Sequence, residues 1–276
     1  MSSVRSRNPR VLVFDSGVGG LSIAGAIKEL NHADIIYVSD NAAFPYGTKS
    51  ETTLIDRTKS VLKEIQQQVE ADIIVIACNT ASTVTLPTLR ESFNEPVIGV
   101  VPAIKPAALV SKSKVIGLLA TPGTVSRDYT HDLIRSFASD CRIVPLGCSE
   151  LVYFAEEKLK GNDIDIQQLI ALMHVFKNNK TIDTVVLACT HFPLLLDELK
   201  IALPDIKHWI DSGDAIARRV AYWIAELGFE TTNHEMKGQS FFTQHDTAID
   251  NLHAALLQNQ LENIQFIELP FTENNV

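Results

Sequence analysis

Long apolar runs are absent from this chain of 276 residues. Its hydrophobic stretches are much shorter than the roughly 20 residues that a membrane-spanning helix needs. The amino-terminal segment MSSVRSRNPR is polar and basic, and it lacks the apolar core and small-residue cleavage site of a secretory signal. We therefore expect a cytoplasmic protein without a membrane partner.

Cysteine is scarce, and a concentrated positive charge is missing. The four cysteines should be reduced in the cytoplasm, which argues against a disulfide framework. The net charge is −9, and the 24 Lys and Arg residues are scattered instead of forming a basic stripe interleaved with aromatics. Nucleic acid is therefore not an expected partner, and the negative balance indicates solubility.

Short β-branched runs recur along the chain, most of them followed by turn residues and a segment with helical spacing. Such runs, apolar on both faces, are typical of strands buried in a parallel sheet. Strands that alternate with helices predict a doubly wound α/β fold. The runs are RVLVFD, DIIYVSD, DIIVIAC, PVIGVV, KVIGLLA, CRIVPL, TVVLAC and KHWID, with SFFTQ and IQFIEL in the tail.

One pattern occurs twice. ADIIVIACNT, from Ala71, aligns without a gap with IDTVVLACTH, from Ile182, and this places Cys78 on Cys189. The repeat predicts two similar flavodoxin-like domains with mostly parallel sheets and an active site in the cleft between them. We expect residues 1–101 plus 210–276 to form the domain of Cys78, and residues 102–209 to form that of Cys189. Because ligands bind at the carboxyl ends of such strands, the two cysteines should meet across the cleft.

Paired thiols at strand ends favour proton transfer. A helix N-terminus stabilises a thiolate, so we expect the pKa of each thiol to fall from its usual value near 8.5 toward neutrality. Thiols on opposite sides of a substrate can invert a carbon stereocentre, because one removes the α-proton and the other delivers a proton to the opposite face. Cys78 and Cys189 are therefore the candidate catalytic residues.

Neighbouring side chains fit the same chemistry. Asp15 ends the first strand and His191 lies two residues after Cys189, so each can orient a thiol or accept its proton. Hydroxyls, amides and backbone N–H groups at strand ends can hold the carboxylates of a small dicarboxylate, and the DSGVGG turn brings backbone close to the ligand. The candidates are Ser16, Asn79, Thr80, Thr121, Thr124 and Thr190.

Other site types fit less well. Cys78, Cys189 and His191 could bind zinc, but the Cys-x-His spacing is tight and no fourth ligand follows. The GVGG turn lacks the Lys-Ser or Lys-Thr of a phosphate loop, and neither cysteine motif contains a Schiff-base lysine. We expect no metal and no cofactor. Two buried structural cysteines remain the alternative to catalysis.

Several motifs together resemble the glutamate racemases of the aspartate/glutamate racemase superfamily. They are FDSGVGGLS, DNAAFPYGTKS, ACNTAS, PVIGVVPAIKPA, ATPGTV, ACTHFPLL and IDSGDAIARR. The resemblance implies cofactor-independent interconversion of L- and D-glutamate, which supplies D-glutamate for peptidoglycan and thus for cell-wall biogenesis and cell shape.

The resemblance also implies residue roles. Cys78 would remove the α-proton of D-glutamate and Cys189 that of L-glutamate. A carboxylate should lie behind His191; Glu156 is the preferred counterpart and Glu150 the alternative, because GCSELVYFAEE matches unevenly. The implied substrate contacts are Asp15, Ser16, Tyr46, Gly47, Asn79, Thr80, Thr121, Thr190 and His191, with Pro45 in the same FPYG bend.

Three rival functions stay open: an aspartate racemase of the same superfamily, a non-catalytic two-lobed amino-acid-binding protein, and a hydrolase or lyase with one nucleophilic cysteine. The resembling subgroup is activated by a UDP-muramyl peptidoglycan precursor. Residues 1–10 are a candidate part of that site, or a disordered polar leader. We expect a monomer or a weak homodimer.

Overall fold

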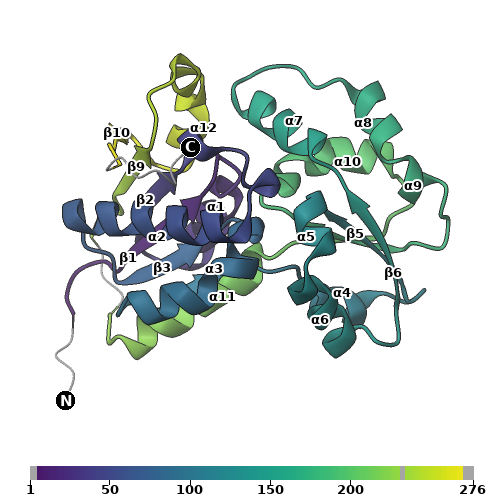
Figure 1. Ribbon diagram of the computed structural model, residues 1–276, viewed down its shortest axis with the longest axis horizontal. Coiled ribbons are helices and arrows are strands. Elements are labelled where there is room, and N and C mark those ends of the chain that lie inside the picture. Colours follow the sequence, from purple (N-terminus) through teal and green to yellow (C-terminus); the bar gives the residue numbers. More distant parts are fainter. Residues whose placement is uncertain (1–4, 231–233, 270–276) are drawn as a thin grey trace.

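Two parallel sheets covered by helices lie side by side in the computed structural model, which describes residues 5–230 and 234–269 (Figure 1). Every strand pairing among these residues is parallel, so the predicted α/β class is confirmed. We call each sheet with its helices a lobe. No helix among the described residues combines the length and the apolar character needed to cross a bilayer.

The first lobe contains a six-stranded sheet in the order β10-β9-β2-β1-β3-β4. Its strands are β1 (Arg10–Asp15), β2 (Asp34–Ser39), β3 (Ile73–Ile76), β4 (Val97–Gly99), β9 (Gly238–Phe242) and β10 (Asn263–Phe266). Its helices are α1 (Leu21–Leu30), α2 (Glu51–Gln68), α3 (Asn79–Ser92), α11 (Gly213–Glu226) and α12 (His253–Gln258), with 3₁₀ turns η1 (Asn41–Ala43), η2 (Tyr46–Thr48) and η4 (Thr247–Leu252).

The second lobe contains a four-stranded sheet in the order β6-β5-β7-β8. Its strands are β5 (Val115–Ala120), β6 (Arg142–Gly147), β7 (Thr184–Ala188) and β8 (His208–Ile210). Its helices are α4 (Ile104–Val110), α5 (Pro122–Ser126), α6 (Asp128–Phe137), α7 (Glu150–Leu159), α8 (Ile166–Leu172), α9 (His174–Lys177) and α10 (Leu196–Ala202), with the 3₁₀ turn η3 (Phe192–Leu195).

The repeat in the sequence is also a repeat in topology. The order β2-β1-β3-β4 of the first sheet reappears as β6-β5-β7-β8, and β9 and β10 extend the first sheet beyond β2. The domain boundaries at residues 101 and 209 remain a prediction; β8 runs to Ile210, one residue past the second boundary.

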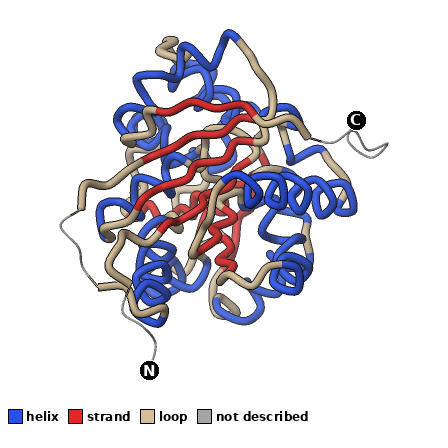
Figure 2. The backbone as a smooth tube through the Cα atoms, turned by 90° about the vertical axis from the view of Figure 1, so that its left-hand side faces the viewer, coloured by secondary structure: helices blue, strands red, loops and turns tan. Residues whose placement is uncertain are grey.

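Alternate residues of the strands face opposite helix layers, which explains the continuous apolar runs. In β1, Val11 packs in the cluster that holds the α1 residue Ile27, whereas Leu12 packs with the α2 residue Leu62. All of these side chains are buried. Each contributes about 1.5–3 kcal/mol of hydrophobic stabilisation, and Figure 2 shows the strands running through the interior between helices.

The two cysteines end their strands differently. Cys78 is the N-cap of α3, as predicted. The prediction of a helix start is wrong for Cys189, because Phe192 N donates to Cys189 O at 3.1 Å and closes a 3₁₀ turn. An α-helix would need a donor at residue 193, and Pro193 has no N–H.

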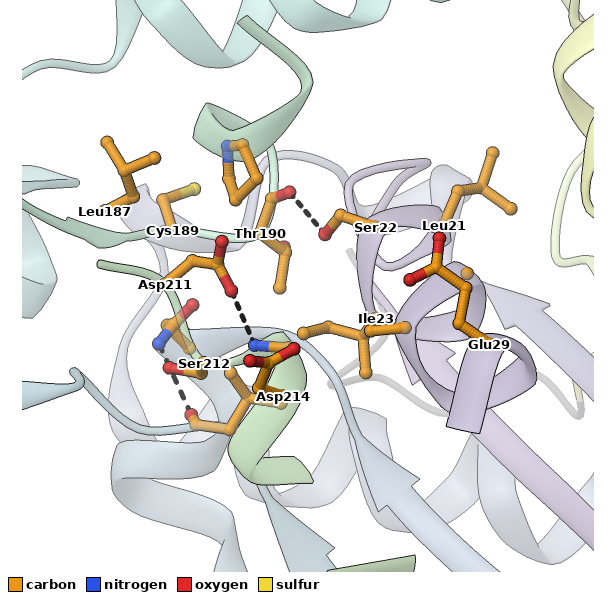
Figure 3. A pocket seen from close by; sticks show the side chains of 16 residues that line it. Leu21, Ser22, Ile23, Glu29, Leu187, Cys189, Thr190, Asp211, Ser212 and Asp214 are labelled. Carbon is orange, nitrogen blue, oxygen red and sulfur yellow. Dashed lines mark hydrogen bonds between the residues drawn. The ribbon is translucent and has the colours of Figure 1, made fainter. Parts of the chain in front are cut away.

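The chain crosses between the lobes twice, after β4 and after β8. The two crossings are hydrogen-bonded to each other, since Ser212 Oγ donates to Val101 O at 2.7 Å. This bond lies beside a cavity of about 270 Å³ between α1 and the start of α11, shown in Figure 3.

Candidate active site

Cys78 and Cys189 line the same cavity, at the carboxyl ends of β3 and β7. The cavity measures about 50 Å³, which is room for a few water molecules and less than an amino acid requires. An amino acid therefore does not fit between the thiols unless the cavity walls rearrange.

Most of the predicted contact residues line this cavity. They are Ser16, Pro45, Tyr46, Gly47, Asn79, Thr80, Thr121, Thr190 and His191. Asp15, Thr124 and Glu156 lie behind these residues instead. The Thr124 hydroxyl, for example, accepts a hydrogen bond from Thr121 Oγ1 at 3.0 Å, so Thr124 contacts the cavity wall and not the cavity.

Sequence reasoning missed five lining residues: Phe44, Thr48, Ser149, Val152 and Tyr153. The first two lie in the DNAAFPYGTKS motif, which could have identified them. The other three lie in the GCSELVYF segment, where the family resemblance is uneven.

On the Cys189 side, one imidazole joins a thiol to a carboxylate. His191 Nδ1 lies 3.8 Å from Cys189 Sγ, and His191 Nε2 lies 2.7 Å from Glu156 Oε1. Of the two candidate carboxylates, Glu156 is therefore the one beside His191, whereas Glu150 accepts a hydrogen bond from Cys148 at 3.5 Å.

This grouping shifts the titration of both partners. Burial opposes the charged imidazole, but the hydrogen bonds with Cys189 and Glu156 outweigh burial and raise the pKa of His191 well above 6.5. Burial also opposes the carboxylate of Glu156, yet its bond to His191 lowers the pKa of that carboxyl. The pair is thus an imidazolium and a carboxylate.

On the Cys78 side, the link to a carboxylate runs through a serine. Cys78 Sγ lies 3.7 Å from Ser16 Oγ, which donates to Asp15 Oδ1 at 3.3 Å. Asp15 is completely buried, and burial raises the pKa of its carboxyl. One hydroxyl thus lies between the Cys78 thiol and the buried Asp15 carboxyl.

The expected lowering of the Cys78 pKa is wrong. Burial, together with the negative charge of Asp15, raises the pKa of the Cys78 thiol to about 12. Hydrogen bonds from Ala81 N and Ser16 act in the opposite direction and are outweighed. The start of α3 therefore does not by itself keep this cysteine ionised.

Hydrogen bonds join the two lobes at the site. Thr190 Oγ1 donates to Asp15 Oδ2 at 2.9 Å, and Val18 N donates to Glu156 Oε1 at 3.0 Å. Ser22 Oγ donates to Thr190 O at 2.8 Å, the bond drawn between those residues in Figure 3. Each carboxylate thus contacts the lobe opposite its own.

Two glycines of the DSGVGG turn, Gly17 and Gly19, face the second lobe. A Cβ atom on Gly17 would lie 2.5 Å from Glu156 Oε1, and one on Gly19 would lie 2.3 Å from His191 Nδ1. The sequence predicted that this turn approaches a ligand. The structure shows that its lack of side chains makes room for the His191–Glu156 pair.

The FPYG bend is fixed from behind. Tyr46 Oη donates to Asp40 Oδ2 at 2.5 Å, and Arg57 Nη2 donates to Asp40 Oδ1 at 2.7 Å. All three side chains are buried, with Asp40 fully so. The Tyr46 hydroxyl therefore has a buried partner within its own lobe, and Tyr46 is one of the residues that line the cavity.

The donors at the cavity wall suit a carboxylate ligand. The lining residues that the structure describes include hydroxyls and the Asn79 amide but no Lys or Arg. Backbone N–H groups at the start of the 14-residue helix α3 add a positive partial charge. No group of three or more His, Cys, Asp or Glu within the described ranges is placed to hold a metal ion.

Comparison with known proteins identifies the family. The model of the Asp/Glu/Hydantoin racemase family matches residues 21–220. The chain belongs to this family.

Named relatives of this racemase family member cover most of its length. A glutamate racemase of Pectobacterium carotovorum is 54% identical over 82% of this chain and 80% of its own. A glutamate racemase of Actinobacillus pleuropneumoniae is 41% identical and covers 95% of this chain and 98% of its own length. The crystal structure of Escherichia coli glutamate racemase in complex with L-glutamate and the activator UDP-MurNAc-Ala is 43% identical, covers 96% of this chain and 100% of that one, and superposes with a TM-score of 0.90.

Proposed function

We propose that this chain interconverts L- and D-glutamate with Cys78 and Cys189 as its two bases. The observation that carries the proposal is that two thiols from equivalent strand ends line one cavity. Curated relatives named glutamate racemase, at 41–54% identity, support glutamate as the substrate.

In the D-to-L direction, the Cys78 thiolate takes the α-proton of D-glutamate, and the C–H electron pair stays on the substrate as a planar carbanion. The Cys189 thiol then gives its proton to the opposite face. L-glutamate results, with Cys78 as the thiol and Cys189 as the thiolate. The L-to-D direction begins from this second state, so each cysteine alternates between acid and base.

The neighbouring groups support these proton transfers. Asp15 is the candidate acceptor of the Cys78 proton, because Ser16 links the thiol to the buried Asp15 carboxyl. The His191 imidazolium stabilises the thiolate of Cys189, and Glu156 holds that imidazolium. We propose that Asp15 and His191 position and charge the thiols.

The substrate carboxylates bind to neutral donors at the cavity wall. Asn79, Thr80, Thr121 and Thr190 supply amide and hydroxyl groups, and the start of α3 supplies backbone N–H groups. Gly47 contributes backbone from the FPYG bend. Such donors orient a dicarboxylate without a side-chain cation next to the α-carbanion.

The proposal extends to the role of the product. We place the enzyme in the cytoplasm, where it supplies D-glutamate for peptidoglycan, without a cofactor. The Escherichia coli relative was crystallised with the activator UDP-MurNAc-Ala, and we propose that a UDP-muramyl precursor activates this chain too. Titrating the precursor at fixed glutamate concentration should raise the rate; a flat titration refutes the regulatory part alone.

The primary test is incubation of the purified protein with L-glutamate in D₂O. Inversion accompanied by α-deuterium supports racemisation, whereas unlabelled L-glutamate after prolonged incubation indicates a binding protein. L-aspartate in a parallel reaction tests the rival aspartate racemase: a higher kcat/KM for aspartate overturns the glutamate assignment.

The roles of the thiols are tested by Cys78→Ala and Cys189→Ala, with Cys141→Ala as the matched control. Removal of either base should lower the racemisation rate by about 10²–10⁴-fold. Cys141 lies outside the cavity, directly before β6, and its replacement should leave the rate unchanged. A Cys78 or Cys189 variant with the wild-type rate contradicts the role given to that residue.

A further inference from the structure

Arg127 reaches from the second lobe to the first. It lies between α5 and α6, and its Nη1 donates to Thr80 O and to Thr83 Oγ1, both at 3.1 Å. Its Nε also lies 3.7 Å from Glu51 Oε1. One guanidinium thus contacts three residues of the opposite lobe.

These contacts fall on the elements that carry the first lobe's half of the cavity wall. Thr80 is in the first turn of α3, which begins after its N-cap Cys78. Glu51 begins α2, directly after the bend that contains Tyr46. Helix α5 packs against both α3 and η2. A shift of Arg127 is therefore transmitted to the cavity walls that hold the first thiol.

Burial makes the hydrogen bonds the stronger part of this contact. The Arg127 side chain is 11% exposed, whereas that of Glu51 is 68% exposed, so solvent screens their ion pair. Thr83 Oγ1 itself donates to Thr80 O at 3.0 Å, which fixes both acceptors relative to each other. Both bonds leave one nitrogen, Nη1, whose two N–H groups have fixed directions in the guanidinium plane, whereas the donors of a lysine ammonium rotate.

Arg127 also differs from the link between Thr80 and Thr121. The contact of Thr80 Oγ1 with Thr121 Oγ1, at 3.3 Å, joins two hydroxyls that line the cavity. A ligand that binds these hydroxyls competes with that contact. Arg127 does not line the cavity, so its bonds to the start of α3 are compatible with an occupied site.

We propose that Arg127 is a positioning residue that clasps the second lobe to the start of α3 and so sets the separation of Cys78 and Cys189. The kinetic consequence rests on the proposed racemisation, because both thiols must reach one carbon. A misplacement of about 1 Å at a reacting centre costs about 10²-fold in rate. The clasp itself concerns only the relative position of the two lobes and does not depend on the identity of the substrate.

Small-angle X-ray scattering of the ligand-free protein tests the clasp independently of function. Arg127→Met keeps the length of the side chain and removes its donors, so the radius of gyration should increase relative to wild type. Arg135→Met is the matched control, because Arg135 is exposed and pairs with Asp132 on its own helix. An unchanged radius of gyration in Arg127→Met overturns the clasp.

Kinetics provide the second readout. In Arg127→Met, kcat should fall about 10- to 100-fold in both directions. Arg127→Lys should recover part of that loss, and Thr83→Val, which removes one acceptor, should show a smaller loss. Full recovery by lysine shows that charge alone matters and overturns the clasp. If the wild-type protein and Arg135→Met both fail to racemise glutamate, the proposed function is refuted instead.

Discussion

Single residues at the site are held by partners on several sides, and His191 is the clearest case. Its ring is 3% exposed, and each ring nitrogen faces a different group, Cys189 Sγ or Glu156 Oε1. The ring of Phe44 packs beside it at a centroid distance of 6.0 Å. The imidazole therefore has one orientation and one favoured charge.

The positive charge of the His191 imidazolium predicts how the free energy of unfolding depends on pH. Folding raises the pKa of His191, so the imidazolium stabilises the folded protein. This stabilisation is fully present below pH 6.5, the ordinary pKa of histidine, and is lost as the pH rises through the pKa of His191 in the folded protein. The free energy of unfolding of wild type relative to His191→Asn should thus decrease as the pH rises from neutrality. Urea unfolding at pH 6, 7.5 and 9 measures it.

The matched control for this measurement is His174→Asn, since His174 is exposed. Its difference from wild type should vary little over the same range. A stability difference between wild type and His191→Asn that grows with pH contradicts the assignment of an imidazolium.

At the scale of elements, the sequence predicted the strands and their polar ends well. Continuous apolar runs leave few alternatives to buried parallel strands, so β1 and β5 begin and end within a residue of their predicted bounds. The helix expected after Cys189 failed because of one missing donor, that of Pro193. Contacts between distant segments, such as Gly19 with His191, have no local signature and could not be predicted.

The turn before α1 provides an element-scale prediction. Gly19→Ala places a methyl group against the buried His191 ring and should displace it from Glu156, so the racemisation rate should fall by at least about tenfold. Gly25→Ala is the matched control, because its Cβ has ordinary space within α1 and alanine favours helix by about 1 kcal/mol. Equal rates in the two variants would contradict this packing argument.

A second element-scale prediction concerns Asp183, the repeat equivalent of Asp72. Its carboxylate accepts from Ser111 Oγ at 2.7 Å and from Ser113 N at 2.8 Å, which organises the loop before β5. Although burial opposes the charge, these bonds lower the pKa of Asp183. The stability that these bonds contribute is therefore fully present above pH 3.8, the ordinary pKa of aspartate. It is lost as the pH falls through the lower pKa of Asp183 in the folded protein.

Asp183→Asn should thus reduce the free energy of unfolding at pH 7 by about 1–3 kcal/mol, and the loss should shrink in strong acid. Chemical denaturation at pH 7 tests the loss, and its repetition at progressively lower pH tests the decrease. The exposed Asp163→Asn serves as the control. A loss that is the same for both variants would show that the loop bonds contribute nothing specific.

At the scale of the whole molecule, the amino-terminal segment is anchored far from the second lobe, as Figure 1 shows. Arg5 and Arg7 donate to Asp72 at 2.7–2.9 Å, and both guanidinium groups lie over the Phe229 ring. Residues 1–4, which were also considered for a regulatory site, lie outside the described residues. Arg5 and Arg7 therefore attach the described part of this segment to the first lobe.

The double variant Arg5→Ala/Arg7→Ala should therefore lower the free energy of unfolding by about 1.5–3 kcal/mol and leave kcat unchanged. Arg10→Ala is the control: its pair with Glu70 is exposed, and its loss should cost at most about 1 kcal/mol. Urea unfolding and a racemisation assay measure the two quantities. A large loss of kcat with full stability would instead connect this segment to the site.

The unlike surroundings of the two thiols, one at an α-helix and one at a 3₁₀ turn, have a thermodynamic consequence. Mirror-image forms of one amino acid have equal free energies in water, so a racemase must leave equal amounts of both. The ratio kcat/KM must then be the same for either enantiomer. The different surroundings of the two thiols can therefore change kcat and KM only in parallel. The enantiomer with the higher kcat must also have the proportionally higher KM.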